Sequence, residues 1–282
     1  MIGADGRQRV CRVEKPIYGM AQAGRRWQRS IFPWLIAHGF KQMQSDTCVF
    51  YRTKTVDTPS GPRVERLLVG CYVDDLFVLK SHDDEHSMYH EFVTALQLDW
   101  EVEDEGPIAD LLGIEITRED EHVVLRQTAY IAKLVETYCP DGVPAKMQRN
   151  TTPCVDDLSD MVLAALAQRL AGQEPDPEVL KAFQSLVGAL LYCATNTRPD
   201  ITFSVSMLCR AMSCPTPELL AAAQHVLHYL HRHRDVGLRY ALDRAPVYGM
   251  SDSDWAVKHS TSGMVFMLNH ATVSWGTKKQ VS

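Results

Sequence analysis

The sequence predicts an α+β fold in which strands and helices alternate first, a helical region follows and a short β segment comes last. Apolar runs of strand length, separated by turn residues, fill much of the first 126 residues. From 161 to 233 the apolar residues recur with a helical period, and 246–282 returns to strand character. This order of elements is typical of an α+β protein.

The first half contains several elements that the residue pattern defines individually. Residues 17–38 place Trp27, Ile31, Trp34 and Leu35 on one helical face, with Pro33 as a kink or break. Further helices are expected at 83–98 and 127–138, strands at 47–53 and 65–80, and a hairpin at 111–117 with 123–126. Residues 57–62 are dense in turn formers and predict an exposed hairpin loop.

Composition excludes some classes of protein and leaves the partner open. The chain has 282 residues, a net charge of −6 and no apolar run long enough to span a membrane. Residues 1–30 hold seven Lys and Arg against two acids, whereas 81–121 hold fourteen acids and one base. Its eight cysteines form no metal-ligand pattern, and the N-terminus is unlike a signal peptide. We therefore expect an intracellular protein with reduced cysteines and a locally basic surface.

Two adjacent aspartates, Asp74 and Asp75, interrupt the apolar segment 66–80, RLLVGCYVDDLFVLK. Aspartate is common in turns, so a solvated turn is the simple alternative. However, the apolar flanks predict strands buried on both faces, and no Gly or Asn supplies the positive φ of a tight turn. Adjacent carboxylates at a hairpin tip repel each other unless a hard cation such as Mg²⁺ neutralises them.

This hairpin and its neighbouring motifs resemble the reverse transcriptases of copia-type retrotransposons. The Y-x-D-D motif is Tyr72–Asp75, and the preceding Lys15–Trp27 segment, KPIYGMAQAGRRW, resembles the family's L-Y-G-L-K-Q-A-P-R-x-W block. Further family blocks follow in order: HGF at 38–40, LGIEI at 112–116, QTAYI at 127–131, LVGALLY at 186–192, TRPDI at 197–201, SDSDWA at 251–256 and SW at 274–275. The resemblance covers the chain from about residue 11 to its end.

The resemblance implies a role for several residues. Asp74 and Asp75 would bind Mg²⁺, or Mn²⁺, for two-metal nucleotidyl transfer, and Tyr72 would lie beneath the primer terminus. Gln22 would contact the incoming nucleotide and template, and Arg25 and Arg26 would face phosphates, unless they form a solvated helix face. Leu112 and Gly113 would position the primer, where glycine allows close backbone approach; a plain turn glycine is the alternative. Asp252 would be the first ribonuclease H carboxylate, whereas Asp254 is expected to be structural.

The resemblance also divides the chain and names its partners. It implies a partial palm without fingers at 1–139, a linker at 140–160, a helical thumb or connection region at 161–245 and the start of a ribonuclease H-like domain at 246–282. Primer–template RNA or DNA and deoxynucleotides are the implied partners, with a cytoplasmic (virus-like particle) or nuclear location. The histidine-rich segment 225–234 is expected to face nucleic acid, with a solvated helix as the alternative.

Two carboxylates of the family are not found in this sequence. A third polymerase carboxylate precedes the L-Y-G-L-K-Q block, and a ribonuclease H glutamate follows the last block; neither has a counterpart here. The chain by itself is therefore expected to show little or no polymerase or nuclease activity. Two interpretations stay open: a polymerase region that acts in a longer protein, or an inactive remnant or domesticated protein that binds nucleic acid.

Overall fold

The computed structural model describes residues 17, 20, 22–144, 151–243, 245–254 and 260–280. Contacts between residues divide the chain into two units, Met1–Pro107 and Ile108–Ser282. Each unit has its own hydrophobic core. The division falls within the region assigned to the palm from the sequence, and the three functional domains and their linker stay a prediction.

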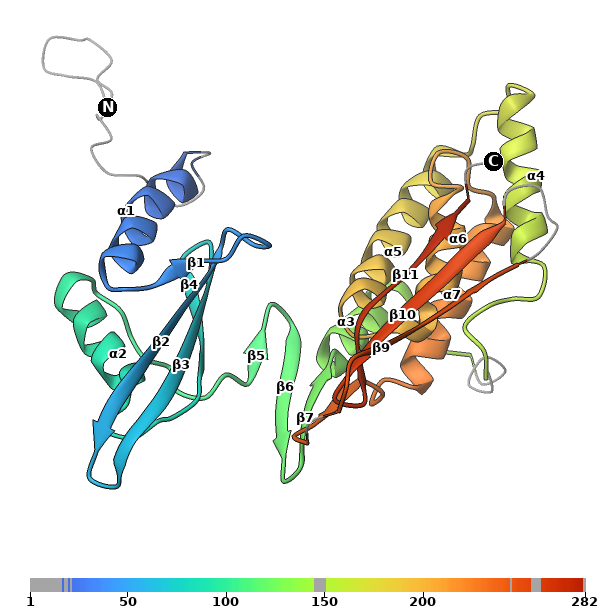
Figure 1. The fold of residues 1–282 in the computed structure, drawn as a ribbon. Coiled ribbons are helices and arrows are strands. Elements are labelled where there is room, and N and C mark those ends of the chain that lie inside the picture. Colours follow the sequence, from blue (N-terminus) through green and yellow to red (C-terminus); the bar gives the residue numbers. More distant parts are fainter. Residues whose placement is uncertain are drawn as a thin grey trace, which may run out of the picture. The chain divides into compact units, whose positions relative to one another are not determined.

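The first unit is a four-stranded antiparallel sheet with two helices (Figure 1). Its elements are α1 (Ala23–Ala37), β1 (Lys41–Gln42), β2 (Val49–Thr58), β3 (Gly61–Tyr72), β4 (Asp75–Lys80) and α2 (Met88–Asp99). Both predicted strands and both predicted helices are present, and segment 65–80 is folded into the β3–β4 hairpin. The turn between β2 and β3 is shorter than the predicted loop, because pairing continues to Thr58 and Gly61.

Among the described residues, apolar side chains cover the sheet of the first unit on one face only, which corrects the prediction of strands buried on both faces. Phe50, Leu67 and Val69 point to one face and are buried against apolar residues of α1 and α2. Alternate positions on the other face, including Val64 and Leu79, are exposed. Both helices pack on the same face, so the apolar flanks of the hairpin are not all core residues.

A buried glutamate fixes the start of α2 on this covered face. Glu65 is 1% exposed, and its Oε2 accepts a 2.6 Å hydrogen bond from the backbone N–H of Met88. Arg63 lies 2.5 Å from Glu65 Oε1 and 2.5 Å from Asp84 Oδ2, so it joins two carboxylates. The hydrogen bond from Arg63 lowers the pKa of Asp84.

The second unit packs a helical core beside two small antiparallel sheets. Its helices are α3 (Thr128–Tyr138), α4 (Leu158–Leu170), α5 (Pro177–Asn196), η2 (Pro199–Ile201), α6 (Thr202–Cys209) and α7 (Pro217–Arg232). One sheet has the order β5-β6-β7-β8: β5 (Asp110–Leu111), β6 (Ile114–Glu119), β7 (His122–Arg126) and β8 (Leu238–Ala241). The other has the order β11-β10-β9: β9 (Tyr248–Ser253), β10 (Thr261–Leu268) and β11 (Ala271–Lys279). The predicted hairpin, helix 127–138 and final strands are confirmed.

Side chains far apart in sequence hold this second unit together. Gln127 is fully buried and accepts a 2.7 Å hydrogen bond from the hydroxyl of Thr197, seventy residues away. At the N-terminus of α3, Glu115 accepts a 2.6 Å hydrogen bond from the backbone N–H of Ala129. The start of α3 is thereby fixed to β6 and to the C-terminal end of α5. In the described part of the chain, no helix is long and apolar enough to cross a membrane.

Candidate active site

The two adjacent aspartates lie at the tip of the β3–β4 hairpin. Tyr72 pairs with Asp75, so Val73 and Asp74 form a two-residue turn. Val73 has a φ of +52°. This left-handed conformation costs a non-glycine residue roughly 1–2 kcal/mol and is an outlier for a β-branched one. The expectation that a sequence without Gly or Asn would avoid a tight turn is therefore wrong, since valine adopts the required conformation.

The polar side chains at this strained turn are exposed to solvent. Asp74 and Asp75 are exposed, and 47% of Tyr72 is exposed beside them. Within the described residues, neither carboxylate has a hydrogen bond or an ion pair. Strain of this kind concentrates at functional sites, where the surrounding structure imposes it. Two unengaged carboxylates thus stand together at a fixed position.

The donor type at this hairpin suits a hard divalent cation. Mg²⁺ prefers oxygen ligands and is usually held by one or two carboxylates, with waters and substrate phosphates completing its shell. Asp74 and Asp75 meet that requirement for carboxylates. Over the part of the chain that the structure describes, no group of three or more His, Cys, Asp or Glu could hold a metal ion.

Gln22, Arg25 and Arg26 gather at the N-terminal turn of α1, in the same unit as the hairpin. Gln22 is the N-cap residue, yet its side chain makes no capping hydrogen bond, and the first turn contains no acid. Both arginines are exposed. Positive side chains at the positive end of a helix dipole are unfavourable unless an anion lies nearby. Trp27 is partly buried against the core of the first unit and packs edge-to-face on Trp100, with ring centroids 5.0 Å apart.

Leu112 and Gly113 form the β5–β6 turn of the second unit. Their φ values are +55° and +77°, so both central residues are left-handed, as in a type I′ turn. A Cβ built on Gly113 would meet nothing within 4 Å. Glycine is favoured here by its positive φ, and the open space beside it leaves the close approach of a primer strand as a prediction.

Asp252 lies on β9, an edge strand of the three-stranded sheet in the second unit. It is exposed and faces Gly263 in the register, and its Oδ1 accepts a 2.8 Å hydrogen bond from the N–H of Ser253. Asp254 accepts a hydrogen bond from the backbone N–H of Thr261 and so ties β9 to β10, in agreement with its predicted structural role. Trp255 lies outside the described residues.

Within the histidine-rich segment 225–234, the structure corrects the expectation for His228, while Arg232 and Arg234 are exposed. His228 is 6% exposed, and its Nε2 lies 3.5 Å from Cys139 Sγ. Burial lowers the pKa of His228. His225 interacts with the carbonyl of Thr152 at 2.9 Å. Helix α7 is a central element of the hydrophobic core, so His228 cannot face nucleic acid.

Two further polar groups were not singled out from the sequence. Arg198 is fully buried and forms a bidentate ion pair with Asp200, with distances of 2.9 and 2.6 Å. The hydroxyl of Tyr192 on α5 donates a hydrogen bond to the carbonyl of Leu112. Arg198 and Tyr192 lie in two of the family blocks found in the sequence, TRPDI and LVGALLY. Their hydrogen-bond partners, however, depend on the fold.

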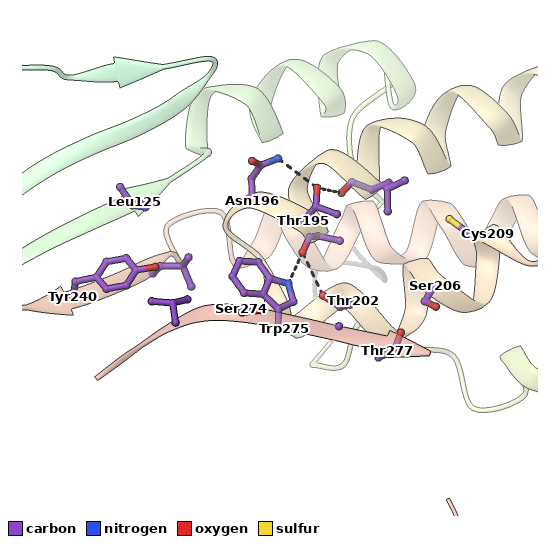
Figure 2. A pocket seen from close by; sticks show the side chains of 15 residues that line it. Leu125, Thr195, Asn196, Thr202, Ser206, Cys209, Tyr240, Ser274, Trp275 and Thr277 are labelled. Atoms are coloured by element: carbon purple, nitrogen blue, oxygen red, sulfur yellow. Dashed lines mark hydrogen bonds between the residues drawn. The ribbon is translucent and has the colours of Figure 1, made fainter. Parts of the chain in front are cut away.

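A cavity of about 630 Å³ lies in the second unit, between α5, α6 and β11 (Figure 2). Trp275 borders it, and its indole N–H donates a 2.7 Å hydrogen bond to the carbonyl of Ala194. The walls are apolar side chains, hydroxyls, the amide of Asn196 and the thiol of Cys209, without a charged residue. None of the residues predicted to bind metal or nucleic acid lines this cavity.

Comparison with known proteins identifies the family. A family model described as reverse transcriptase (RNA-dependent DNA polymerase) matches residues 2–147. The chain therefore belongs to the reverse transcriptase family. Its relatives further identify it as a copia-type retrotransposon reverse transcriptase region.

Curated relatives match nearly the whole chain. It is 29% identical over 277 residues to the retrovirus-related Pol polyprotein from transposon RE1 of Arabidopsis thaliana, and 30% identical over 277 residues to that from transposon RE2. Each match covers 96% of this chain but only 17% of the relative. A putative transposon Ty5-1 protein of Saccharomyces cerevisiae is 28% identical over 93% of the chain and 80% of its own length. No solved structure matches the chain.

Proposed function

We propose that this chain carries the catalytic hairpin of an RNA-directed DNA polymerase that extends a primer with deoxynucleotides. The observation that carries the proposal is the exposed two-residue turn, in which a left-handed Val73 presents Asp74 and Asp75. Membership of the reverse transcriptase family supports this interpretation, because it explains why two free carboxylates occupy a strained position. The chain spans only 17% of the Pol polyproteins, and we propose the complete activity for a protein that also contains the other regions of such a polyprotein.

Each residue of the proposed site has a defined task. Asp74 and Asp75 hold Mg²⁺ or Mn²⁺, which activates the primer hydroxyl and stabilises the charge on the transferred phosphate when bound. Tyr72 supports the primer terminus, Gln22 contacts the nucleotide and template, and Arg25 and Arg26 bind phosphates. In the second unit, the Leu112–Gly113 turn contacts the primer strand, and Asp252 contributes to a ribonuclease H site.

A second candidate is a nucleic-acid-binding protein without catalysis. The observation that favours it is that, among the described residues, no third acidic or metal-ligating group joins the two aspartates. The exposed arginines of α1 would still contact phosphates in such a protein. Binding would then be salt-dependent and independent of divalent metal.

One set of variants separates the two candidates. Asp74→Asn and Asp75→Asn remove the proposed ligands, and Asp57→Asn is the matched control, an exposed aspartate on β2 at the opposite end of the same sheet. Mn²⁺ binding is followed by electron paramagnetic resonance, and synthesis on poly(rA)/oligo(dT) by primer extension with Mg²⁺ or Mn²⁺. If Asp74→Asn and Asp75→Asn lose Mn²⁺ binding and Asp57→Asn keeps it, the result supports the polymerase site.

Metal binding that is equal in all variants refutes the proposed metal site. A primer–template mobility shift that persists in the hairpin variants and weakens with salt, without Asp74-dependent synthesis or metal binding, favours the second candidate. Failure of the unaltered chain to shift the duplex at low salt contradicts both.

A further inference from the structure

The Leu112–Gly113 turn has a conformation that its own sequence does not favour. Type I′ turns prefer Asn-Gly, because asparagine tolerates a positive φ and can hydrogen-bond to its own backbone. Leu112 can do neither, and 47% of it is exposed, so burial of its side chain does not compensate for the strain. The turn must therefore be held by other groups.

Side chains hold both polar groups of the peptide unit between these two residues. Its carbonyl, from Leu112, accepts a hydrogen bond from the hydroxyl of Tyr192, eighty residues away. Its N–H, from Gly113, donates a 3.1 Å hydrogen bond to Asp110 Oδ1. With both ends of the peptide engaged, its plane cannot rotate without breaking a hydrogen bond. A free peptide at the tip of a hairpin would have water as its only partner.

The tyrosine that holds the carbonyl is itself on a rigid element. Tyr192 contacts the ring of Tyr130 edge-to-face at 5.1 Å, and the neighbouring Leu190 and Cys193 of α5 are fully buried. Tyr130 belongs to α3, whose first turn is bound by Glu115 from the strand that follows the Leu112–Gly113 turn. Hydroxyl and turn are therefore fixed to the same pair of helices.

We infer that Tyr192 is a positioning residue, whose hydroxyl keeps the Leu112–Gly113 turn in the shape that contacts the primer strand. The inference rests on the proposed function and adds a residue on α5 to it. The held peptide leaves the Leu112 side chain exposed, and space around Gly113 is open to a ligand, since an added Cβ would meet no atom within 4 Å. An apolar side chain and an open backbone suit the sugar face of a nucleic-acid strand, and a fixed turn contacts it without an ordering cost.

Tyr192→Phe tests whether the hydroxyl fixes the turn, because the variant loses the hydroxyl and keeps the ring that contacts Tyr130. The matched control is Tyr138→Phe: Tyr138 lies on α3, and its hydroxyl is 2.6 Å from the Ser185 hydroxyl on α5, away from the turn. In the full chain without nucleic acid, we expect amide hydrogen exchange at 111–114 to rise about fivefold in Tyr192→Phe, the effect of one lost hydrogen bond. Tyr138→Phe should leave exchange at these residues unchanged.

A rescue variant separates positioning from general loosening. Leu112→Asn places a residue that tolerates the left-handed conformation in the turn. Combined with Tyr192→Phe, it should bring exchange at 111–114 back to near the original rate. Equal exchange in Tyr192→Phe and the unaltered chain overturns the inference.

The functional arm measures affinity for a poly(rA)/oligo(dT) duplex at one fixed salt concentration. Tyr192→Phe should weaken binding several-fold, whereas Tyr138→Phe should not. Faster exchange with unchanged affinity overturns the role in primer contact. Absence of binding by the unaltered chain overturns the proposed function and the primer contact together. The exchange rates then show by themselves whether the Tyr192 hydroxyl fixes the conformation of the turn.

Discussion

The indole N–H of Trp275 donates a 2.7 Å hydrogen bond to the backbone carbonyl of Ala194, and this bond joins β11 to the end of α5. Ala194 is almost completely buried, so water cannot replace the indole without opening the contact. The last strand of the chain is thereby anchored on the helical core of the second unit. The bond also fixes the ring that borders the cavity of Figure 2.

Trp275→Phe should lower the free energy of unfolding of the second unit by about 1–2 kcal/mol, because a buried carbonyl loses a donor. The carbonyl keeps a second contact, a 3.3 Å hydrogen bond from Thr202, which limits the loss. Thermal unfolding followed by circular dichroism measures the effect. Trp34→Phe is the control, since its indole binds Asp99 in an exposed pair. An equal effect in both variants would contradict the anchoring role.

Val73→Gly should raise the free energy of unfolding of the first unit by about 1 kcal/mol, because glycine adopts a φ of +52° without strain. Val64→Gly is the matched control: Val64 is 55% exposed, Val73 is 53% exposed, and Val64 lies within the regular strand β3. Glycine at that position should destabilise by about 1 kcal/mol. Urea unfolding measures both, and destabilisation of similar size in the two variants would show that Val73 is unstrained.

Asp200→Asn should lower the free energy of unfolding by about 3 kcal/mol, because it leaves the charge of Arg198 buried without its partner. The Arg198 side chain is 0% exposed, and Tyr229 donates a further 3.0 Å hydrogen bond to Asp200. Glu174→Gln breaks the exposed ion pair with Arg169 and should cost less than about 1 kcal/mol. Urea unfolding distinguishes the two, and a cost for Asp200→Asn no greater than the control would show that the buried pair is dispensable.

His228 should make folding stability depend on pH below about 6.5. Burial lowers its pKa in the folded chain below the ordinary value of 6.5, so the unfolded chain takes up a proton first as the pH falls. Stability is therefore retained above pH 6.5 and decreases as the pH falls from 6.5 towards the lower folded pKa. His228→Gln should reduce the loss of stability between about pH 7 and pH 5, a range that includes this interval. His90→Gln, at an exposed position, should leave the loss unchanged. Identical pH dependence in the two variants would mean that His228 is hydrated.

Local sequence patterns predicted most elements of the fold, and they located Asp74 and Asp75 because a hairpin motif is contiguous. They did not reveal which face of the β3–β4 hairpin is covered, since an apolar run has the same composition whether helices cover one face or two. They misjudged Val73, because the strands on either side impose its conformation against the preference of the residue. They also misplaced His228, because a basic residue at helical spacing can lie on the inner face when a thiol and apolar residues surround it.

The long-range hydrogen bonds of the second unit could not be predicted from the sequence, for a different reason. Gln127 and Thr197 are seventy residues apart, and Tyr192 and Leu112 are eighty apart. The motifs that contain them indicate ancestry, whereas the pairing between motifs depends on how the helices pack. Arg198 illustrates the same limit, since an arginine in a short motif gives no sign that it will be fully buried.

The separate cores of the two units also determine which part of the chain an optical signal reports. Three of the five tryptophans, Trp27, Trp34 and Trp100, precede Pro107, and Trp27 and Trp100 contact each other. The long helices α5 and α7, in contrast, belong to the second unit. Intrinsic fluorescence will therefore follow mainly the sheet that bears the hairpin, and far-ultraviolet ellipticity mainly the helical unit. Denaturation curves from the two signals need not coincide, and their separation would give the stability of each unit without cutting the chain.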